Sequence, residues 1–534
     1  MENSISIKHQ FWALVLISIL FILVAPSVWY YTPDGGIYIG TAESMVETGQ
    51  YRFNGYPNLL YYPGFSSLLS LPILVFGVNF RILHLLCACI AVASLWLLRS
   101  YFTPSRYGLV GLALPVILAC ASIFQQQVFF ILSDGTFLVI SLGALLLWRI
   151  YIEKSYRWAL ITCFALVAFA PMVRFQGLFL SVAFTIALFM KEVSKKGLSA
   201  SGVAMSAVGG LGTLAPFAAW TWRNLQQHTP HTHNMANSFF FGLKGLTLHA
   251  PGFRMVDYID AEWKYGIYNL MLSIENLVRT FFGYRIPALI PTKVVLIVLV
   301  IIVLAGTLRL LKLATNMERA YVLISVAFLA CSSLNSHNLF GVTRYWLPLA
   351  AFAIVAAGFG LRSIYNLFKD IRYRAVVSTI FGFLIVLILS NGVSNFLEFN
   401  GKSNYYRNAH EVVGKVKQFM DEETSPTIPV ATTDWGVLPF TLKRTCYKTL
   451  NDESHLLTLE RMDKYQTGYL VIVDQLGSAS PYEQKMVEDL PQLFSLMLEV
   501  QPEGEGPAAA VYSVDLEGVQ KFLNSASKQD TTKN

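Results

Sequence analysis

Charged residues are scarce for a chain of this length. Only 14% of the 534 residues are Asp, Glu, Lys or Arg, while 54% are hydrophobic and the mean hydropathy is +0.50. A typical soluble domain carries about 25% charged residues. The deficit is uneven, because long apolar runs alternate with short basic loops from Phe11 to about Phe396 and an ordinary soluble composition follows. We therefore predict a membrane domain at 1–394, a further domain at 395–523 and a polar, disordered end at 524–534.

Cysteine is also scarce. The six cysteines are Cys87, Cys89, Cys120, Cys163, Cys331 and Cys446. Five of them lie in apolar segments, and no CxxC motif occurs, so neither a disulfide framework nor a cysteine zinc site is expected. The net charge of +7 does not indicate nucleic-acid binding, because the basic residues sit in short loops between apolar runs, where membrane topology explains them.

The apolar runs predict an all-α polytopic membrane protein with a small α/β C-terminal domain. Since a helix needs about 20 apolar residues to cross a bilayer, we expect about eleven transmembrane helices. Their expected ranges are 11–30, 80–99, 107–124, 130–149, 157–173, 175–190, 201–222, 290–308, 319–334, 345–361 and 375–393. The fifth and sixth are short and meet at residues 171–174, which predicts either a tight pair of spans or a broken, re-entrant element.

Lysine and arginine placement predicts the orientation. Most loop cations fall on one side of the membrane, and the opposite short loops carry only Arg52, Arg81, Arg174 and Arg344. Because cytoplasmic loops are enriched in Lys and Arg, the N-terminus is predicted to be cytoplasmic. An odd number of spans then places the loops at 31–64 and 223–289 and the C-terminal domain outside the cell (inner) membrane. The first span lacks a good cleavage site and is expected to be retained.

The first outer loop is the most informative stretch of the chain. Thr32 as N-cap, Pro33 at the first helical position and Gly49 as C-cap predict a short amphipathic helix on the membrane surface. Asp34 falls in its first turn. An ionised carboxylate there can act as a general base towards a hydroxyl acceptor, or it can merely favour the helix dipole. The apolar run at 65–76 is too short to span a bilayer.

A series of residues in this loop resembles a known family. The series is Asp34, Tyr38, Ala42, Gly49, Tyr51, Tyr62, Pro63, Gly64, Phe76 and Gly77. It is similar to the GT-C superfamily of membrane glycosyltransferases, in particular the branch of protein O-mannosyltransferases and lipid A aminoarabinose transferases. Many members carry a second acidic residue beside the first, where this chain has Gly35. That departure leaves Asp34 as the sole candidate at this place and weakens the case for a metal.

The resemblance continues at the outer ends of later spans. The matching residues are Arg81, Asp134, Arg174 with Gly177, Pro216 with Trp220, Arg223 and Asn224, and Arg344 with Tyr345 and Pro348. Each motif alone is weak, and their order and common outer placement carry the resemblance. It covers roughly residues 11–365.

The resemblance implies transfer of a sugar from a polyprenyl-phosphate donor to an extracytoplasmic protein, lipid or glycan. The implied catalytic residues are Asp34 and Asp134. The implied phosphate-binding residues are Arg81, Arg174, Arg223 and Arg344, each of which can instead snorkel or pair with a carboxylate. Asp134 can position the acceptor, bind a metal or pair with an arginine. Tyr38, Glu43, Tyr62 and His337 are expected around the donor and acceptor.

Three histidines, His228, His231 and His233, follow the seventh span and are weak candidates for a metal site. Alternatively, these histidines are merely solvated in a loop. The sequence therefore predicts no certain cofactor and leaves a divalent metal open.

Two functional classes other than a transferase remain open. A transporter or flippase for a lipid-linked sugar would be expected to show two related halves with polar sites at the midplane, and the sequence has no such repeat. A polysaccharide polymerase or ligase would share the donor chemistry, and a non-catalytic scaffold would not need it.

In the C-terminal part, the segments Ile428–Asp434, Tyr469–Asp474 and Ala508–Val514 are predicted to be strands, and the segment 409–420 is amphipathic.

Overall fold

A computed structural model describes most of the chain. The described residues are 2–59, 61–197, 199–227, 292–335, 344, 346–367, 371–432, 436–449, 455–473 and 482–531. His228, His231, His233 and His337 lie outside these residues.

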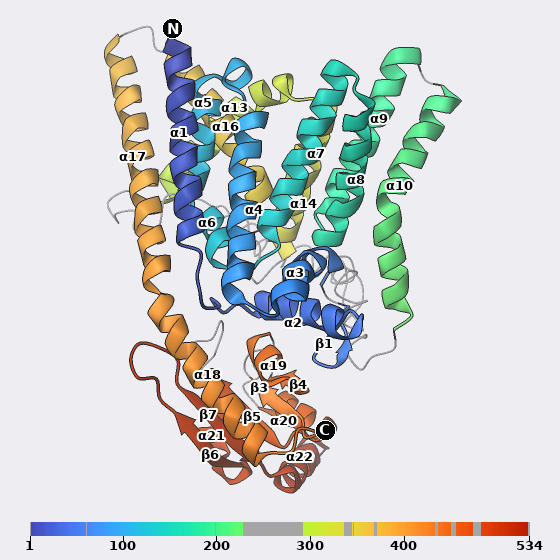
Figure 1. The fold of residues 1–534 in the computed structure, drawn as a ribbon, viewed down its shortest axis with the longest axis vertical. Coiled ribbons are helices and arrows are strands. Elements are labelled where there is room, and N and C mark those ends of the chain that lie inside the picture. The colour runs from blue at the N-terminus through green and yellow to red at the C-terminus, as the bar shows by residue number, and fades with distance from the viewer. Residues whose placement is uncertain are drawn as a thin grey trace.

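The described chain has a helical part and a sheet at one end of it (Figure 1). Apart from α2 and α3, the helices of the helical part are α1 (Glu2–Leu23), α4 (Phe80–Tyr101), α5 (Pro104–Ala119), α6 (Ser122–Phe129), α7 (Asp134–Lys154), α8 (Arg157–Val173), α9 (Gly177–Lys196), α10 (Ala200–Leu225), α13 (Thr292–Leu313), α14 (Asn316–Asn335), α16 (Leu347–Leu367) and α17 (Ile371–Gly401). Helices lie within every segment predicted to span the membrane, so the helical fold class is confirmed.

Five of these helices are long and apolar enough to cross a bilayer. They are Phe80–Tyr101, Asp134–Lys154, Gly177–Ser194, Ala200–Asn224 and Leu347–Asn366, and the search that found them covers only the described residues. The bent pair of α5 and α6 adds a sixth if it is counted as one span. The expected number of spans stays a prediction.

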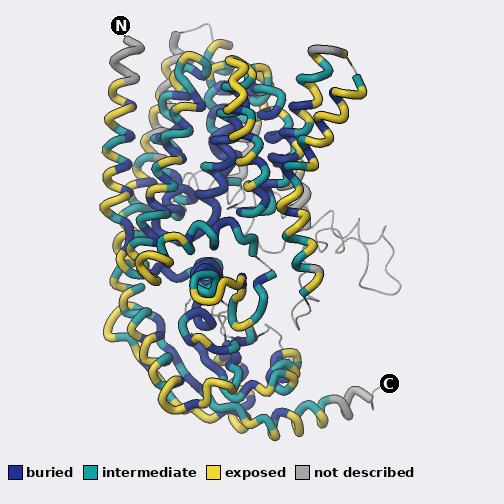
Figure 2. Tube along the Cα trace, turned by 45° about the vertical axis from the view of Figure 1, so that its right-hand side comes forward, coloured by how far each residue is buried: buried dark blue, intermediate teal, exposed yellow. Residues whose placement is uncertain are grey.

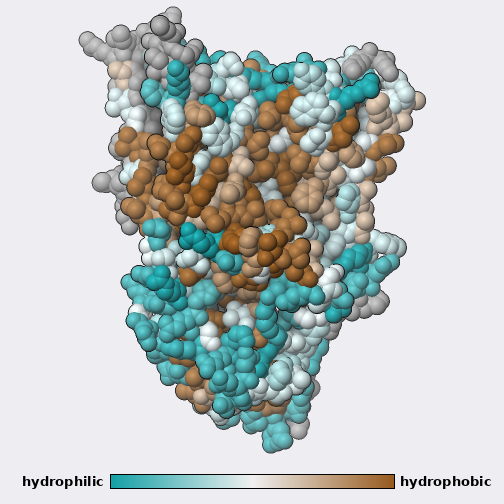
Figure 3. Space-filling model, in the orientation of Figure 1, coloured by the Kyte–Doolittle hydropathy of each residue, from teal (hydrophilic) through white to brown (hydrophobic). Residues whose placement is uncertain are grey.

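Exposed apolar side chains agree with a bilayer around the helices. Figure 2 shows buried residues inside the helical part and exposed residues along its outer helices. Among the exposed ones are Leu16, Leu109, Ile161 and Val208, each more than half accessible. On the face drawn in Figure 3, hydrophobic residues form a broad band between a hydrophilic rim and the hydrophilic sheet region. Apolar patches of this extent are rare on soluble monomers and mark a membrane or partner surface.

The first predicted span extends too far. Helix α1 ends at Leu23, and the chain from Val24 to Thr32 is not helical. Pro26 explains the difference, because proline disfavours helical backbone in the residue before it. The aromatic residues Trp29, Tyr30 and Tyr31 that follow are buried, so they pack inside the protein and do not belong to a lipid-facing helix.

The third predicted span is broken. Helices α5 and α6 meet at Cys120 and Ala121 with a bend of 51°. The hydropathy averaged over a stretch of sequence depends only on composition, so it does not detect such a bend. The fifth and sixth predicted spans are two separate helices, α8 and α9, joined by the turn Arg174–Gln176 (Figure 1).

Helices α2 (Pro33–Thr48) and α3 (Pro63–Phe76) lie across the end of the long helices, next to the sheet (Figure 1). Helix α2 starts as predicted, because the Thr32 hydroxyl accepts a hydrogen bond from the Gly35 N–H at 3.1 Å. It ends at Gly49, whose φ of 69° is left-handed. A short hairpin of β1 (Arg52–Phe53) and β2 (Tyr56–Pro57) joins the two helices.

The C-terminal region contains a five-stranded sheet in the order β4-β3-β5-β7-β6. The strands are β3 (Val430–Thr432), β4 (Cys446–Lys448), β5 (Tyr469–Val473), β6 (Phe494–Val500) and β7 (Ala509–Val514). Strands β4, β3 and β5 are parallel, whereas β7 is antiparallel to both β5 and β6. The three strands predicted here correspond to β3, β5 and β7, whereas β4 and β6 were not predicted.

Helices accompany this sheet. They are α18 (Ser403–Glu423), α19 (Val437–Leu442), α20 (Leu456–Lys464), α21 (Tyr482–Asp489), the 3-10 helix η1 (Pro491–Leu493) and α22 (Leu516–Thr531). Helix α18 contains the predicted amphipathic segment and buries Val412, Val413, Val416 and Met420. Helix α22 extends past residue 524, the expected domain boundary, to Thr531. It starts with Asp515 accepting from the Gly518 N–H at 3.1 Å, and its polar residues continue the helix to Thr531.

Candidate active site at the end of the helices

Asp34 is held by two hydrogen-bond donors from distant parts of the chain. The Tyr61 hydroxyl donates to Oδ1 at 2.6 Å, and Arg344 Nη2 donates to Oδ2 at 2.8 Å. The Asp34 side chain is 20% exposed. Tyr61 comes from the segment between β2 and α3, and Arg344 lies shortly before α16. Both carboxylate oxygens of Asp34 are therefore engaged.

The surroundings of Asp34 favour its ionised form. Burial alone would raise the pKa of this carboxyl, but the charge of Arg344, the Tyr61 hydroxyl and the more distant charge of Arg174 lower it, and the pKa lies below its usual value. The carboxylate is charged at neutral pH. A carboxylate held in this way is also a weak base, because a proton that it accepts must compete with these donors.

Asp134 and Arg174 form a second ion pair beside the first. Arg174 Nη1 lies 2.9 Å from Asp134 Oδ1, and the two side chains are 11% and 3% exposed. Arg174 also donates to Ser133 Oγ at 3.0 Å and to Gln176 Oε1 at 3.1 Å. The other carboxylate oxygen of Asp134, Oδ2, is buried and has no hydrogen-bond partner among the described residues. Buried polar atoms without partners are uncommon, so this oxygen is available to a ligand hydroxyl or water.

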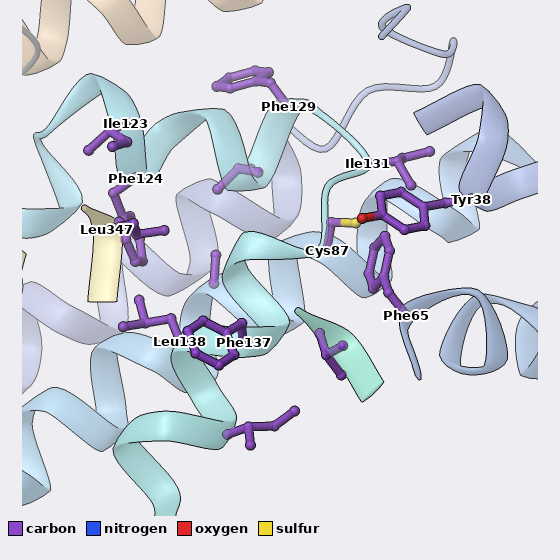
Figure 4. Packing of buried hydrophobic residues seen from close by; sticks show 14 of the residues in the cluster. Tyr38, Phe65, Cys87, Ile123, Phe124, Phe129, Ile131, Phe137, Leu138 and Leu347 are labelled. Carbon is purple, nitrogen blue, oxygen red and sulfur yellow. The ribbon is translucent and has the colours of Figure 1, made fainter. Parts of the chain in front are cut away.

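Tyr38 connects the two ion pairs. Its hydroxyl lies 2.9 Å from Ser133 Oγ, which also accepts from Arg174. Its ring packs edge-on against Tyr61 and Phe65, with centroids 5.0 Å and 4.9 Å away. Figure 4 shows Tyr38 and Phe65 gathered with Ile131 in the buried cluster. Burial raises the pKa of Tyr38, so its hydroxyl stays protonated.

The turn that carries Arg174 is held near Asp34 by close contacts between backbone segments. A Cβ on Gly177 would lie 2.2 Å from the Ala170 carbonyl carbon, and a Cβ on Gly64 would lie 2.7 Å from the Met172 carbonyl oxygen. Only glycine permits these contacts, which pack α9 against α8 and α3 against the end of α8. A Cβ on Gly35 would similarly lie 2.6 Å from Thr32 Oγ1, which caps α2. A side chain at position 35 would therefore displace the Thr32 cap.

The other predicted site residues lie further out. Arg223 stacks over the Trp220 ring at 4.5 Å and donates to Asn224 Oδ1 at 2.9 Å. Arg81 is exposed in the first turn of α4 and makes no hydrogen bond or ion pair with the residues described. The Tyr62 ring packs towards Phe217, with centroids 5.8 Å apart.

The sequence pattern pointed to Tyr62, but its neighbour Tyr61, Ser133 and Gln176 were not predicted as site residues. All three flank motif residues, at Tyr61-Tyr62-Pro63, Ser133-Asp134 and Arg174-Phe175-Gln176. The sequence therefore showed which residues belong to a motif, but it did not show which of their side chains point into the site. Among the described residues, no group of three or more His, Cys, Asp or Glu is arranged to hold a metal.

The C-terminal region contacts the helix that carries Asp34. A Cβ on Gly436 would lie 2.0 Å from the Pro33 carbonyl oxygen, so the start of α19 and the start of α2 touch through their backbones. Lys443 pairs with Glu43 on the same helix. Asn54 in the hairpin donates to the Cys446 carbonyl at 2.8 Å and accepts from the Cys446 N–H at 3.1 Å. Asp34 thus lies between the long helices and the sheet region.

Comparison with known proteins supports the fold. No family model and no curated protein sequence matches the chain. Among solved structures, apo ArnT from Cupriavidus metallidurans is similar with a TM-score of 0.56 and 12% identity, covering 94% of this chain and 98% of that one. ArnT bound to undecaprenyl phosphate gives a TM-score of 0.52 at 13% identity, covering 93% and 97%.

A second enzyme has the same fold. The archaeal oligosaccharyltransferase AglB from Archaeoglobus fulgidus, in complex with an inhibitory peptide and a dolichol-phosphate, gives a TM-score of 0.52 at 13% identity. The match covers 93% of this chain and 73% of AglB. ArnT and AglB are polytopic membrane glycosyltransferases of the GT-C superfamily. The predicted resemblance to that superfamily is therefore confirmed at the level of the fold.

Proposed function

We propose that this protein is a membrane glycosyltransferase that moves a sugar from a polyprenyl-phosphate donor to an extracytoplasmic acceptor. The observation that carries the proposal is the ionised Asp34, paired with Arg344 and close to the Asp134–Arg174 pair, at the end of the helices in a fold shared with ArnT. The solved ArnT and AglB complexes contain undecaprenyl phosphate and a dolichol-phosphate, which supports a lipid phosphate as the donor class.

The chemistry follows from the charges of the site. In the transfer, an acceptor hydroxyl attacks the anomeric carbon, the bond from that carbon to the phosphate oxygen breaks, and the hydroxyl proton passes to Asp34. Negative charge then increases on the departing phosphate, and guanidinium groups stabilise such charge well. Arg344 and Arg174 are the two predicted phosphate ligands beside the carboxylates, and we assign this role to them. We assign acceptor positioning to Asp134, because its buried Oδ2 can accept a hydrogen bond from a hydroxyl.

The described residues around Asp34 do not fit a divalent metal. Both carboxylate oxygens face hydrogen-bond donors, two arginines lie nearby, and a side chain at position 35 would displace the Thr32 cap. A cation at this place would meet positive charge and too few oxygen ligands. The proposed transfer therefore contains no step through a metal.

The test is a comparison of Asp34→Asn with Glu47→Gln. Glu47 lies on the same helix, is exposed and provides a matched loss of one carboxylate. In a strain that lacks the gene, lipid-linked sugars and cell-surface glycans would be measured after complementation. We expect wild type and Glu47→Gln to restore transfer and Asp34→Asn to lose at least about 10²-fold, the lower end of a general base's contribution. Equal protein levels and thermal stability would be verified on the same membranes.

Restored transfer with Asp34→Asn would remove Asp34 from the mechanism. A deletion strain without any change in lipid-linked sugars or glycans would contradict the transferase assignment itself. A flippase would give a different result in the deletion strain. The donor would accumulate on the inner leaflet, while transfer from donor on the outer leaflet would still take place.

A further inference from the structure

Arg344 is shared between two anions if the proposed function holds. In this structure its Nη2 donates to Asp34 Oδ2 at 2.8 Å, and the proposed donor brings a phosphate that needs the same guanidinium. Arg174 is held more firmly, because Asp134, Ser133 and Gln176 all accept from it and its side chain is 11% exposed. The Arg344 side chain is 26% exposed. Arg344 is thus the more exposed of the two arginines, so moving it to another partner disturbs less buried structure.

Asp34 cannot serve well as a base while Arg344 holds it. Its two oxygens accept from Arg344 and Tyr61, and the positive charge opposes protonation. Among the described residues, the other charged or titratable groups that act on it are Arg174 and Tyr38. Helix α19, which packs against the start of α2, contributes no titratable side chain between Val437 and Leu442. The state of Asp34 therefore depends mainly on the position of Arg344.

We propose that Arg344 passes from Asp34 to the phosphate of the lipid donor, so that donor binding releases Asp34 to act as the base. A phosphate offers a guanidinium several oxygens and a bidentate geometry, and it carries at least as much charge as a carboxylate. Once Arg344 has moved, Asp34 keeps the Tyr61 hydrogen bond but loses its nearest positive charge. Its affinity for a proton rises, and the acceptor hydroxyl meets an active base only when the donor is present.

This inference rests on the proposed function and adds an order to it. The donor binds before the acceptor is activated, which prevents the base from acting on water or acceptor alone. Because the proton affinity of Asp34 increases when the donor binds, donor binding takes up protons at mildly acidic pH. Linkage then requires that the donor binds more tightly as the pH falls towards the raised pKa.

The experiment measures binding of undecaprenyl phosphate to the purified full-length protein in lipid nanodiscs. Four proteins are compared: wild type, Asp34→Asn, Arg344→Gln and the double variant. If Asp34 competes for Arg344, Asp34→Asn should bind about fivefold or more tightly than wild type, in the range of ordinary coupling between sites. Arg344→Gln should bind more weakly, and in its background Asp34→Asn should change the affinity less than about twofold.

Three results would overturn the inference. Asp34→Asn binding that is unchanged or weaker shows that Asp34 does not compete with the phosphate. An equal gain in the Arg344→Gln background shows simple charge repulsion without exchange of the arginine. Failure of the wild-type protein to bind undecaprenyl phosphate, when nanodiscs without protein serve as the blank, overturns the proposed donor and this inference with it.

Proton uptake provides a second readout that does not depend on how the Arg344 variant folds. Calorimetry in two buffers of different ionisation enthalpy, at about pH 5.5, should show more proton uptake for wild type than for Asp34→Asn. Equal uptake by the two proteins would contradict the proposed exchange.

Discussion

Replacing Gly436 with alanine should displace Asp34 without touching it. Gly436 precedes α19, and its added Cβ would lie 2.0 Å from the carbonyl oxygen and 2.5 Å from the Cα of Pro33, the residue next to Asp34. These are backbone atoms, so no side chain can rotate away. The φ of Gly436 is −119°, which alanine adopts without strain, and the effect is therefore purely steric.

The contact distances determine the expected size of the effect. An ordinary contact to Cβ is at least 3.4 Å long, so α2 and α19 must separate by more than about 1 Å. Overpacking of this kind costs about 1–3 kcal/mol of stability. A misplacement of about 1 Å at a catalytic group lowers the rate by about 10²-fold, so we expect a loss of transfer of that order.

A matched control lies in the same region. Gly414 in α18 is exposed, and a Cβ there meets nothing within 4 Å. Gly414→Ala should stabilise the protein by about 0.5–1 kcal/mol, because alanine favours a helix over glycine, and it should leave transfer unchanged. Thermal unfolding and complementation would be measured for both variants. A Gly436→Ala protein as stable and active as Gly414→Ala would refute the idea that the sheet region positions Asp34.

Two further predictions concern the C-terminal region and its side of the membrane. Burial lowers the pKa of His410 to about 4, and its neutral Nε2 accepts from the Trp29 N–H at 3.2 Å. Stability should therefore fall as pH decreases from about 6.5 to about 4, because the unfolded state binds the proton first, and unfolding of His410→Gln should show a weaker pH dependence in that window. For topology, a cysteine in place of Gly414 should react with a membrane-impermeant maleimide added outside the cell. A cysteine in place of Lys154, at the far end of α7, should react only after permeabilisation. The reverse pattern would show that the predicted orientation is wrong.

Local chemistry made some elements predictable almost to the residue. Helix α2 has its cap at Thr32, its proline at the first position and its terminating Gly49 as expected, because each acts over a few residues only. The long helices followed from apolar composition in the same way. Their bends did not, since the break between α5 and α6 depends on packing that a hydropathy window ignores.

Strands β4 and β6 were missed for different reasons. Strand β4 has only three residues, Cys446–Lys448, which is too short for a periodic signal. Strand β6 exposes most of its middle residues, so it lacks the apolar run that identified β5. The parallel pairing of β3 with both neighbours places these strands together through contacts that a sequence pattern does not contain.

For the site, the sequence predicted only that its residues lie at the same side of the membrane, at the outer ends of the spans. Orientation placed Asp34, Asp134, Arg174 and Arg344 on one side, and the structure brings them together in two ion pairs. Asp34 and Arg344 are 310 residues apart in the chain, and no local rule selects Arg344 over Arg81. The selection of Tyr61 over Tyr62 likewise depends on how the chain enters α3.

Helix α7 offers a way to separate a structural role of these charges from a chemical one. It carries Asp134 at one end, paired with Arg174, and Arg149 towards the other end, paired with Glu318 at 2.6 Å. Replacing a buried ion pair by apolar residues of similar volume is often neutral or stabilises a protein by about 1–4 kcal/mol, whereas removing one partner leaves a buried charge and costs about 3–5 kcal/mol. Double exchanges to Leu and Met are therefore more informative than single ones.

We expect both double variants, Asp134→Leu with Arg174→Met and Glu318→Leu with Arg149→Met, to remain folded within a few degrees of wild type by thermal unfolding. Ser133 keeps its contact with the Tyr38 hydroxyl in the first variant, so no new buried hydroxyl is left without a partner. Only the first variant should lose transfer, because only its charges lie beside Asp34. Wild-type transfer by a folded Asp134→Leu, Arg174→Met protein would mean that this pair merely supports the fold, and the acceptor-positioning role of Asp134 would have to be abandoned.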